Sequence, residues 1–193
     1  MNFSTEKLLA IARNYWRADT VYDEKRERSP EALRLDALLQ ETLQRDDYSR
    51  WLKLDQELQQ ELPGFIISSG VSAHEHCFQC VAYSGFKPGG FPRFRLAVAG
   101  CISILAPVYI VYGLEYDLTR SEVHYPKLSF EPLPPEMRGP ADLISRKLET
   151  TFDVRKLPRE VAETPIPLIV RWKEPPETTL FHALFTSLPE NVK

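Results

Sequence analysis

The sequence predicts an α+β protein: helices packed on a mainly antiparallel sheet of about 5–6 strands, preceded by an N-terminal helical segment. Apolar residues recur at helical spacing through residues 1–62, and Pro63 and Gly64 then end the helical pattern. Beyond Gly64 the period shifts toward two, and β-branched and aromatic residues become frequent, which is typical of strands. The strand candidates follow one another at hairpin-like spacing, which favours antiparallel pairing.

The most apolar stretch, residues 91–117, predicts the centre of the sheet. Its pattern predicts one strand over residues 93–99 and a second over residues 102–116, meeting at Gly100. Apolar and polar residues alternate in the first strand, so we expect one buried and one solvated face. The second strand is apolar on both faces, which is typical of a central strand that is covered on both sides.

Three helices are predicted in the N-terminal region, residues 1–62. Ser4 and Ser29 are placed to cap the first two, and Pro30 suits a first helical turn because it lacks an N–H. The third helix is predicted over residues 48–62, with one apolar face directed inward.

The remaining elements alternate between short strands and short helices. Further strands are predicted over residues 65–69, 71–84, 123–130 and 168–172, and helices over residues 140–151 and 178–188. Residues 154–167 are interrupted by prolines and predicted to be irregular. We expect a single domain over residues 1–193, consisting of a helical region over residues 1–62 and an α+β region over residues 65–193.

Composition and charge exclude several functional classes. A net charge of −3 and a pI near 5.9 argue against a dedicated nucleic-acid-binding protein. Three cysteines without a repeating framework favour a reducing compartment. The apolar run 96–114 contains Gly100, Pro107 and Gly113, which favours a sheet over a membrane span. The N-terminus carries charges within its apolar pattern, unlike a signal peptide. We therefore expect a cytoplasmic protein without a membrane partner.

The densest group of potential metal ligands is the segment 74–80, HEHCFQC. On a strand, His74, His76 and Cys80 would point to one face and could supply three ligands for zinc, a fourth coming from elsewhere. Cys77 and Cys80 would point to opposite faces, which does not suit redox work by the pair. The favoured interpretation is a strand with two partly exposed histidines and two core cysteines, and the zinc enzyme or sensor stays as an alternative.

No motif in the sequence predicts a catalytic residue or a cofactor. The serines lack a nucleophile-elbow pattern. The glycine-rich segment 85–90 is followed by a strand candidate, whereas phosphate loops lead into a helix, so we expect a hairpin tip. Glu115 and Asp117 share a strand face, but the polar residues that follow them favour a solvated turn.

The central strand pair, RFRLAVAGCISILAPVYIVYGLEYD, is followed by short strands and a helix. This layout, over about residues 71–152, resembles that of the immunity proteins of bacterial polymorphic toxin systems. The resemblance implies a non-catalytic protein that binds one cognate toxin domain and occludes its active site.

The helical region, residues 1–62, carries the whole charge excess, with 10 Lys+Arg against 13 Asp+Glu, or −3. Complementary charge would speed the encounter with a basic toxin. The expected contact residues combine acidic side chains with tyrosines: Asp19, Tyr22, Asp23, Glu24 and Glu27 in a charged connection, and Asp46, Asp47 and Tyr48 at a corner. A structural or small-ligand-binding module is a further alternative, which a pocket of roughly 300 Å³ or more would support. The oligomeric state is left open.

Overall fold

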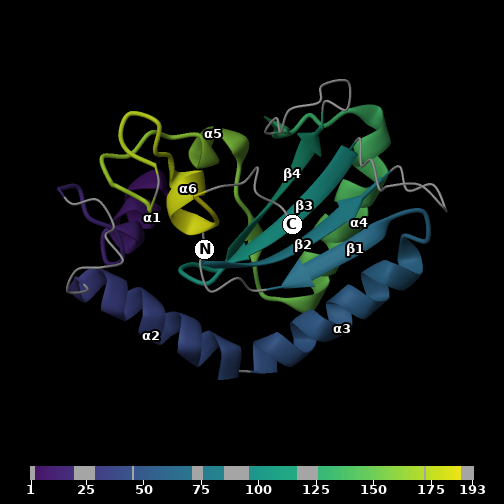
Figure 1. The fold of residues 1–193 in the computed structure, drawn as a ribbon, viewed down its shortest axis with the longest axis horizontal. Coiled ribbons are helices and arrows are strands. Elements are labelled where there is room, and N and C mark those ends of the chain that lie inside the picture. The colour runs from purple at the N-terminus through teal and green to yellow at the C-terminus, as the bar shows by residue number, and fades with distance from the viewer. Residues whose placement is uncertain are drawn as a thin grey trace.

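The computed structural model describes residues 3–19, 29–44, 46–70, 76–84, 96–116, 126–171 and 173–187 (Figure 1). The elements are α1 (Thr5–Ala12), α2 (Pro30–Gln44), α3 (Asp46–Glu61), β1 (Ile66–Gly70), β2 (Cys77–Tyr83), β3 (Leu96–Ser103), β4 (Val108–Glu115), β5 (Lys127–Ser129), α4 (Pro135–Thr151), β6 (Arg155–Lys156), α5 (Arg159–Ala162) and α6 (Leu180–Leu184). The predicted α+β class, with helices on a mostly antiparallel sheet after an N-terminal helical segment, is confirmed.

The sheet has the order β1-β2-β3-β4-β5, and each neighbouring pair is antiparallel. The two-residue strand β6 adds a parallel pair to β4. Because β3 occupies one edge of β4, β5 and β6 share the other edge, β5 along 113–115 and β6 along 108–109.

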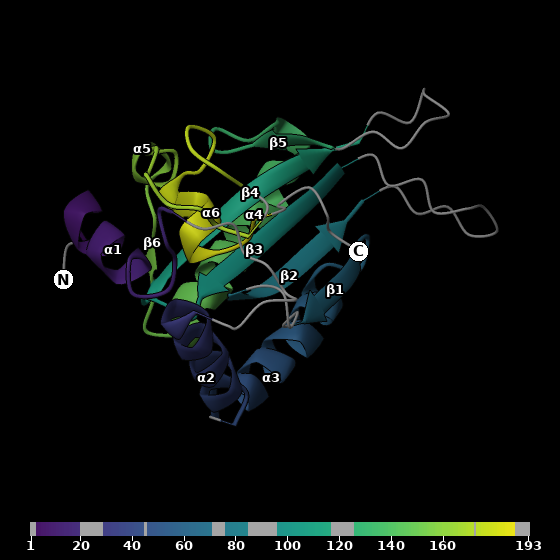
Figure 2. The same cartoon turned by 60° about the vertical axis from the view of Figure 1, so that its left-hand side comes forward.

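Helices cover both faces of the sheet, and Figure 2 shows α6 and α4 on opposite sides of it. Apolar residues of α3 and α4 pack on one face, and those of α1, α6 and the segments around α5 pack on the other. Strand β4 is buried on both faces, as predicted. The solvated face expected for 93–99 is wrong for its described end, because Ala97, Val98 and Ala99 are all buried between the two helical layers.

Gly100 lies inside β3, opposite Val111 of β4, and the turn between these strands comes later, at 104–107. The prediction that two strands meet at Gly100 is therefore wrong. A Cβ atom on Gly100 would collide with the Cγ2 atom of Ile144 in α4. Because this glycine has no side chain, α4 can approach the sheet closely. The sequence alone does not distinguish a glycine needed for such close packing from a glycine in a turn.

The two predicted serine caps are confirmed. The Ser4 hydroxyl oxygen accepts a hydrogen bond from the Lys7 N–H (3.3 Å), and the Ser29 oxygen accepts one from the Ala32 N–H (3.2 Å). These bonds satisfy amide groups that would otherwise lack a partner at the helix starts.

Helix α4 begins at Pro135, five residues before the predicted start. Pro140 lies inside it and is buried against the sheet, so burial offsets the backbone hydrogen bond that this proline cannot make.

The C-terminal segment differs most from the prediction. Residues 154–167 contain β6 and α5. Within 168–171, the described part of the predicted strand 168–172, only isolated bridges form, one of them between Ile169 and Arg17. Leu168 and Val170 are buried in the core beneath α1 and α6 instead of joining the sheet. No helix in the described ranges combines the length and apolarity that crossing a membrane requires.

Candidate partner-binding surface

The predicted contact residues are only partly visible in the structure. Tyr22, Asp23, Glu24 and Glu27 lie outside the described residues. Asp46 and Asp47 open α3, but their side chains also lie outside the described portion of the chain. Asp19 and Tyr48 are described, and both are exposed.

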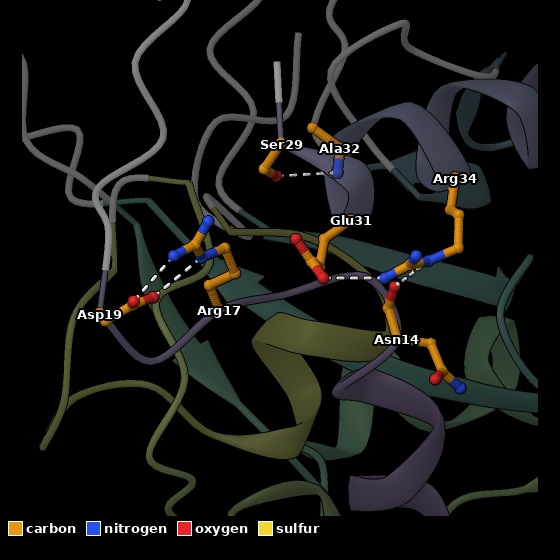
Figure 3. Close-up of polar contacts among 7 residues, drawn as sticks. All are labelled: Asn14, Arg17, Asp19, Ser29, Glu31, Ala32 and Arg34. Atoms are coloured by element: carbon orange, nitrogen blue, oxygen red, sulfur yellow. Dashed lines mark hydrogen bonds and ion pairs between the residues drawn. The ribbon is translucent and has the colours of Figure 1, made fainter. Parts of the chain in front are cut away.

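Asp19 is part of an ion pair at the junction of α1 and α2 (Figure 3). The Arg17 guanidinium donates two hydrogen bonds to its carboxylate, at 2.8 and 2.7 Å. This pairing raises the pKa of Arg17 above its ordinary value. The negative charge of Asp19 is therefore largely neutralised, and this residue contributes less to an acidic surface than its sequence position suggested.

Arg34 fixes the start of α2 to the end of α1 (Figure 3). Its Nε–H donates to the Asn14 carbonyl oxygen (2.8 Å), and its Nη2 donates to Glu31 (2.8 Å). The pKa of Glu31 is lowered, first by a hydrogen bond from its own backbone amide and then by Arg34. The helix is thereby held in one orientation on the body of the protein.

The outer side of α2 and α3 exposes apolar side chains that sequence reasoning largely missed. Within the described ranges, the exposed large apolar residues are Leu33 (54%), Leu52 (46%), Tyr48 (37%) and Ile66 (37%), on α2, α3 and the edge strand β1. Figure 1 shows α2 and α3 end to end along one side of the molecule. We call the surface formed by Leu33, Tyr48 and Leu52 the helical-pair surface. Tyr48 alone was among the predicted contacts.

Charge on these two helices is predominantly negative. Residues 30–61 contain eight acidic residues against four basic ones, which gives −4. Exposed uncharged positions such as Ala37, Gln40 and Gln56 lie between the charges. The surface therefore combines exposed apolar groups with a negative field, as protein interfaces often do.

A cavity of about 340 Å³ lies where the end of α2, the start of α3, the 104–107 turn and the end of α4 meet. Phe78, Ile102 and Phe152 contribute apolar walls, and Thr42 and Ser103 contribute hydroxyl groups. The sequence pattern gave no sign of this pocket, because its residues are far apart in the chain. Its volume meets the criterion stated above for the ligand-binding alternative.

The zinc alternative is not supported by the described residues. His74 lies outside them. His76 packs against Trp16, with ring centroids 4.9 Å apart, and its Nε2–H donates to the His182 carbonyl oxygen (2.8 Å). Cys80 packs in the opposite core, near Ile144. The prediction that His76 and Cys80 point to one face is wrong, because His76 precedes the first residue of β2 and the alternation of side chains along a strand does not extend to it. Nowhere in the described portion of the chain do three or more potential ligands gather.

The three cysteines are all buried, and burial raises the pKa of the Cys80 thiol. We expect none of them to react with Ellman's reagent in the native protein within the time that a free thiol needs to react completely. All three should react in denaturant. Rapid modification of one native thiol would contradict this burial.

The predicted carboxylate pair is also only half described. Glu115 ends β4 and is exposed, and Asp117 lies outside the described residues. No known protein family, curated protein or solved structure was found to match this chain. The functional proposal therefore rests on the helical-pair surface and on the resemblance of layout.

Proposed function

We propose that this protein is a non-catalytic immunity protein that acts in the cytoplasm and neutralises a cognate bacterial toxin domain by covering its active site. One observation carries the proposal: the exposed large apolar residues of the described chain all lie on α2, α3 and the adjoining strand β1. Exposed apolar and aromatic side chains are frequent at protein-binding sites, and the elements that carry these four follow one another along one side of the molecule.

The charge of the helical pair indicates the kind of partner. A net −4 over residues 30–61, of which Lys147 of α4 offsets one charge, favours a basic partner, because opposite charges accelerate encounter and penalise acidic competitors. Toxin domains that act on nucleic acids are basic for the same electrostatic reason. Covering such a domain with acidic helices would block the surface that its substrate needs.

Ion pairs and core packing hold α3 against the body of the protein, so that its outer side is a preformed surface. The Lys147 ammonium of α4 binds both Glu57 (2.8 Å) and Glu61 (2.5 Å) of α3. On the inner side of α3, Trp51 and Leu54 are buried in the core. A preformed surface loses less conformational entropy when it binds, which supports tight association.

Replacing Tyr48 and Leu52 together by arginine should abolish protection. Each variant would be co-expressed with a toxin domain encoded next to the gene of this protein. We expect cells that carry the double variant to die and cells that carry the wild-type protein to survive. Binding should weaken by at least about 100-fold, because two exposed anchors are lost and a basic partner is repelled. Isothermal titration calorimetry would measure the affinity, and thermal unfolding would show that the variant stays folded.

The matched control replaces Asp142 of α4 and Glu160 of α5 by arginine. Both positions are exposed, and this variant changes the net charge more than the test variant does. It should protect fully. Protection by the Tyr48/Leu52 variant would remove the proposed surface, and failure of the wild-type protein to bind or protect would remove the proposed function.

A small-ligand-binding module is the second candidate, and the 340 Å³ cavity is the observation that favours it. Native mass spectrometry of the purified protein tests it. A stoichiometric small molecule that the wild-type protein retains would support this candidate, and its absence would favour the binding protein.

A further inference from the structure

We infer that the cavity at the junction of α2 and α3 receives a single aromatic side chain of a basic partner protein, at a position adjacent to a lysine or arginine. We call this cavity the corner pocket, and the residues that line it include Thr42, Arg50, Phe78, Ser103, Phe152 and Asp153. The inference rests on the proposed function, which it extends by naming the chemistry of the anchor.

The corner pocket adjoins the helical-pair surface. Thr42 stands near the end of α2 and Arg50 in the second turn of α3, and both line the pocket. Tyr48 is exposed and lies two residues before Arg50 in α3, less than one helical turn away. A partner that rests on Tyr48 has the pocket within reach, and a side chain inserted there would be removed from water, as interface anchors are.

The walls favour an aromatic ring. The Arg50 guanidinium carbon lies 4.9 Å from the centre of the Phe152 ring, so a flat cation is already stacked on one aromatic face. A guanidinium can stack on a second ring with its other face while its N–H groups keep their own partners. Phe78 adds a further aromatic surface at the pocket wall. A ring inserted beside Arg50 would gain stacking that an aliphatic side chain cannot make.

The two wall hydroxyls favour a ring with a polar tip. Thr42 and Ser103 are each only 6% exposed. The Thr42 hydroxyl donates to the Leu38 carbonyl oxygen (2.8 Å), so its oxygen can still accept a bond. The Ser103 oxygen accepts from the Leu105 N–H (3.1 Å), so its O–H can still donate. A tyrosine hydroxyl both donates and accepts, and therefore matches this pair.

Charge around the pocket selects the neighbouring residue. Arg50 and Asp153 give the lining one charge of each sign, so the negative field comes from the adjoining helices, whose sequence charge is −4. A lysine or arginine next to the inserted ring would lie in this negative field. The volume of 340 Å³ is at the lower end of the range for small-molecule sites, which suits one side chain.

Capped dipeptides test the inference on the full-length protein. We would titrate ¹⁵N-labelled protein with N-acetyl-Tyr-Arg-amide, N-acetyl-Ala-Arg-amide and N-acetyl-Tyr-Glu-amide and follow the backbone amide signals by NMR. The Tyr-Arg probe should shift the amides of Thr42, Ser103 and Phe152. The other two probes should bind at least about fivefold more weakly, since each lacks one of the two recognised groups.

A filling variant and a matched control locate the binding. Val154→Phe places a ring in the pocket that Val154 lines, and should abolish the shifts. Val161→Phe makes the same change in α5, in the opposite core, and should leave them unchanged. Thermal unfolding would show that both variants are folded. Shifts that persist in Val154→Phe, or that are absent in the wild-type protein, would overturn the inference.

The probe series also separates this inference from the alternatives. Equal binding of uncharged N-acetyl-tyrosine amide would indicate a small-ligand pocket and would overturn the basic-neighbour requirement. Full toxin binding without any dipeptide binding would overturn the anchor and leave the proposed function standing. If the protein binds the dipeptide but fails to protect cells, the pocket's preference for an aromatic ring beside a basic residue stands and the proposed immunity function falls.

Discussion

Replacing Gly100 by alanine is expected to destabilise the protein by about 3 kcal/mol, because overpacking at a rigid contact forces the backbone or a neighbouring helix to move. The new methyl group would collide with Ile144 and crowd Cys80 and Leu148 as well. Ile144 is β-branched and buried, so its side chain is restricted at χ1 and cannot readily move aside. Urea unfolding followed by circular dichroism would measure the loss as a lower transition midpoint.

Gly113→Ala is the matched control for this prediction. Gly113 also lies in a central strand beneath α4, but the added methyl group would mainly meet the sulfur of Met137. A methionine side chain is flexible and can move aside, so we expect a loss nearer about 1 kcal/mol. Equal losses at both glycines would show that the rigidity of Ile144 is not the cause.

Much of the fold follows from local patterns in the sequence. Helix starts were predictable because Ser4 and Ser29 satisfy backbone amides within their own first turns. The central strands were predictable because β-branched and aromatic residues are dense there. Gly100 was misassigned because a glycine required by a helix more than 40 residues away leaves no local trace.

The candidate site was less predictable than the fold. Acidic residues with tyrosines pointed to a region that includes the start of α3, where Tyr48 is exposed. However, the exposure of Leu33 and Leu52 depends on which helix face the rest of the protein covers, which apolar spacing alone does not determine. The corner pocket combines residues as distant as Thr42, Ser103 and Phe152, so only tertiary packing could reveal it.

The segment 74–80 shows a related limit. Its pattern predicted a shared face for His76 and Cys80, but His76 turns away before β2 begins and joins the C-terminal segment. The Trp16 Nε1–H donates to the Ala183 carbonyl oxygen (3.0 Å), and His182 accepts from the Thr179 N–H at its Nδ1 (3.1 Å). These contacts connect α1, the start of β2 and α6 at one buried point.

This histidine pair should make the protein sensitive to acid. Burial lowers the pKa of His76 to about 3, and burial together with Lys173 lowers that of His182 to about 4, both from 6.5. The hydrogen bonds also favour uncharged rings. His76 Nδ1 is buried without a hydrogen-bond partner in the described chain, and His182 Nδ1 already accepts a hydrogen bond. Protonation would leave a buried N–H without an acceptor at His76 Nδ1, and it would break the hydrogen bond that His182 Nδ1 accepts.

We therefore expect stability to be constant above pH 6.5 and to fall below it, as the unfolded chain gains protons that the folded protein excludes. At about pH 5, His76 alone should account for about 2 kcal/mol of lost stability, and the less buried His182 for a smaller amount. Urea unfolding at a series of pH values would measure this loss of stability.

His76→Gln should be less stable than the wild-type protein at neutral pH, yet its stability should depend less on pH below 6.5. Because His74, His124 and His182 are present in both proteins, the difference between the two curves isolates His76. Parallel curves would mean that His76 has the same pKa in the folded and unfolded protein, which would contradict the burial of an uncharged ring.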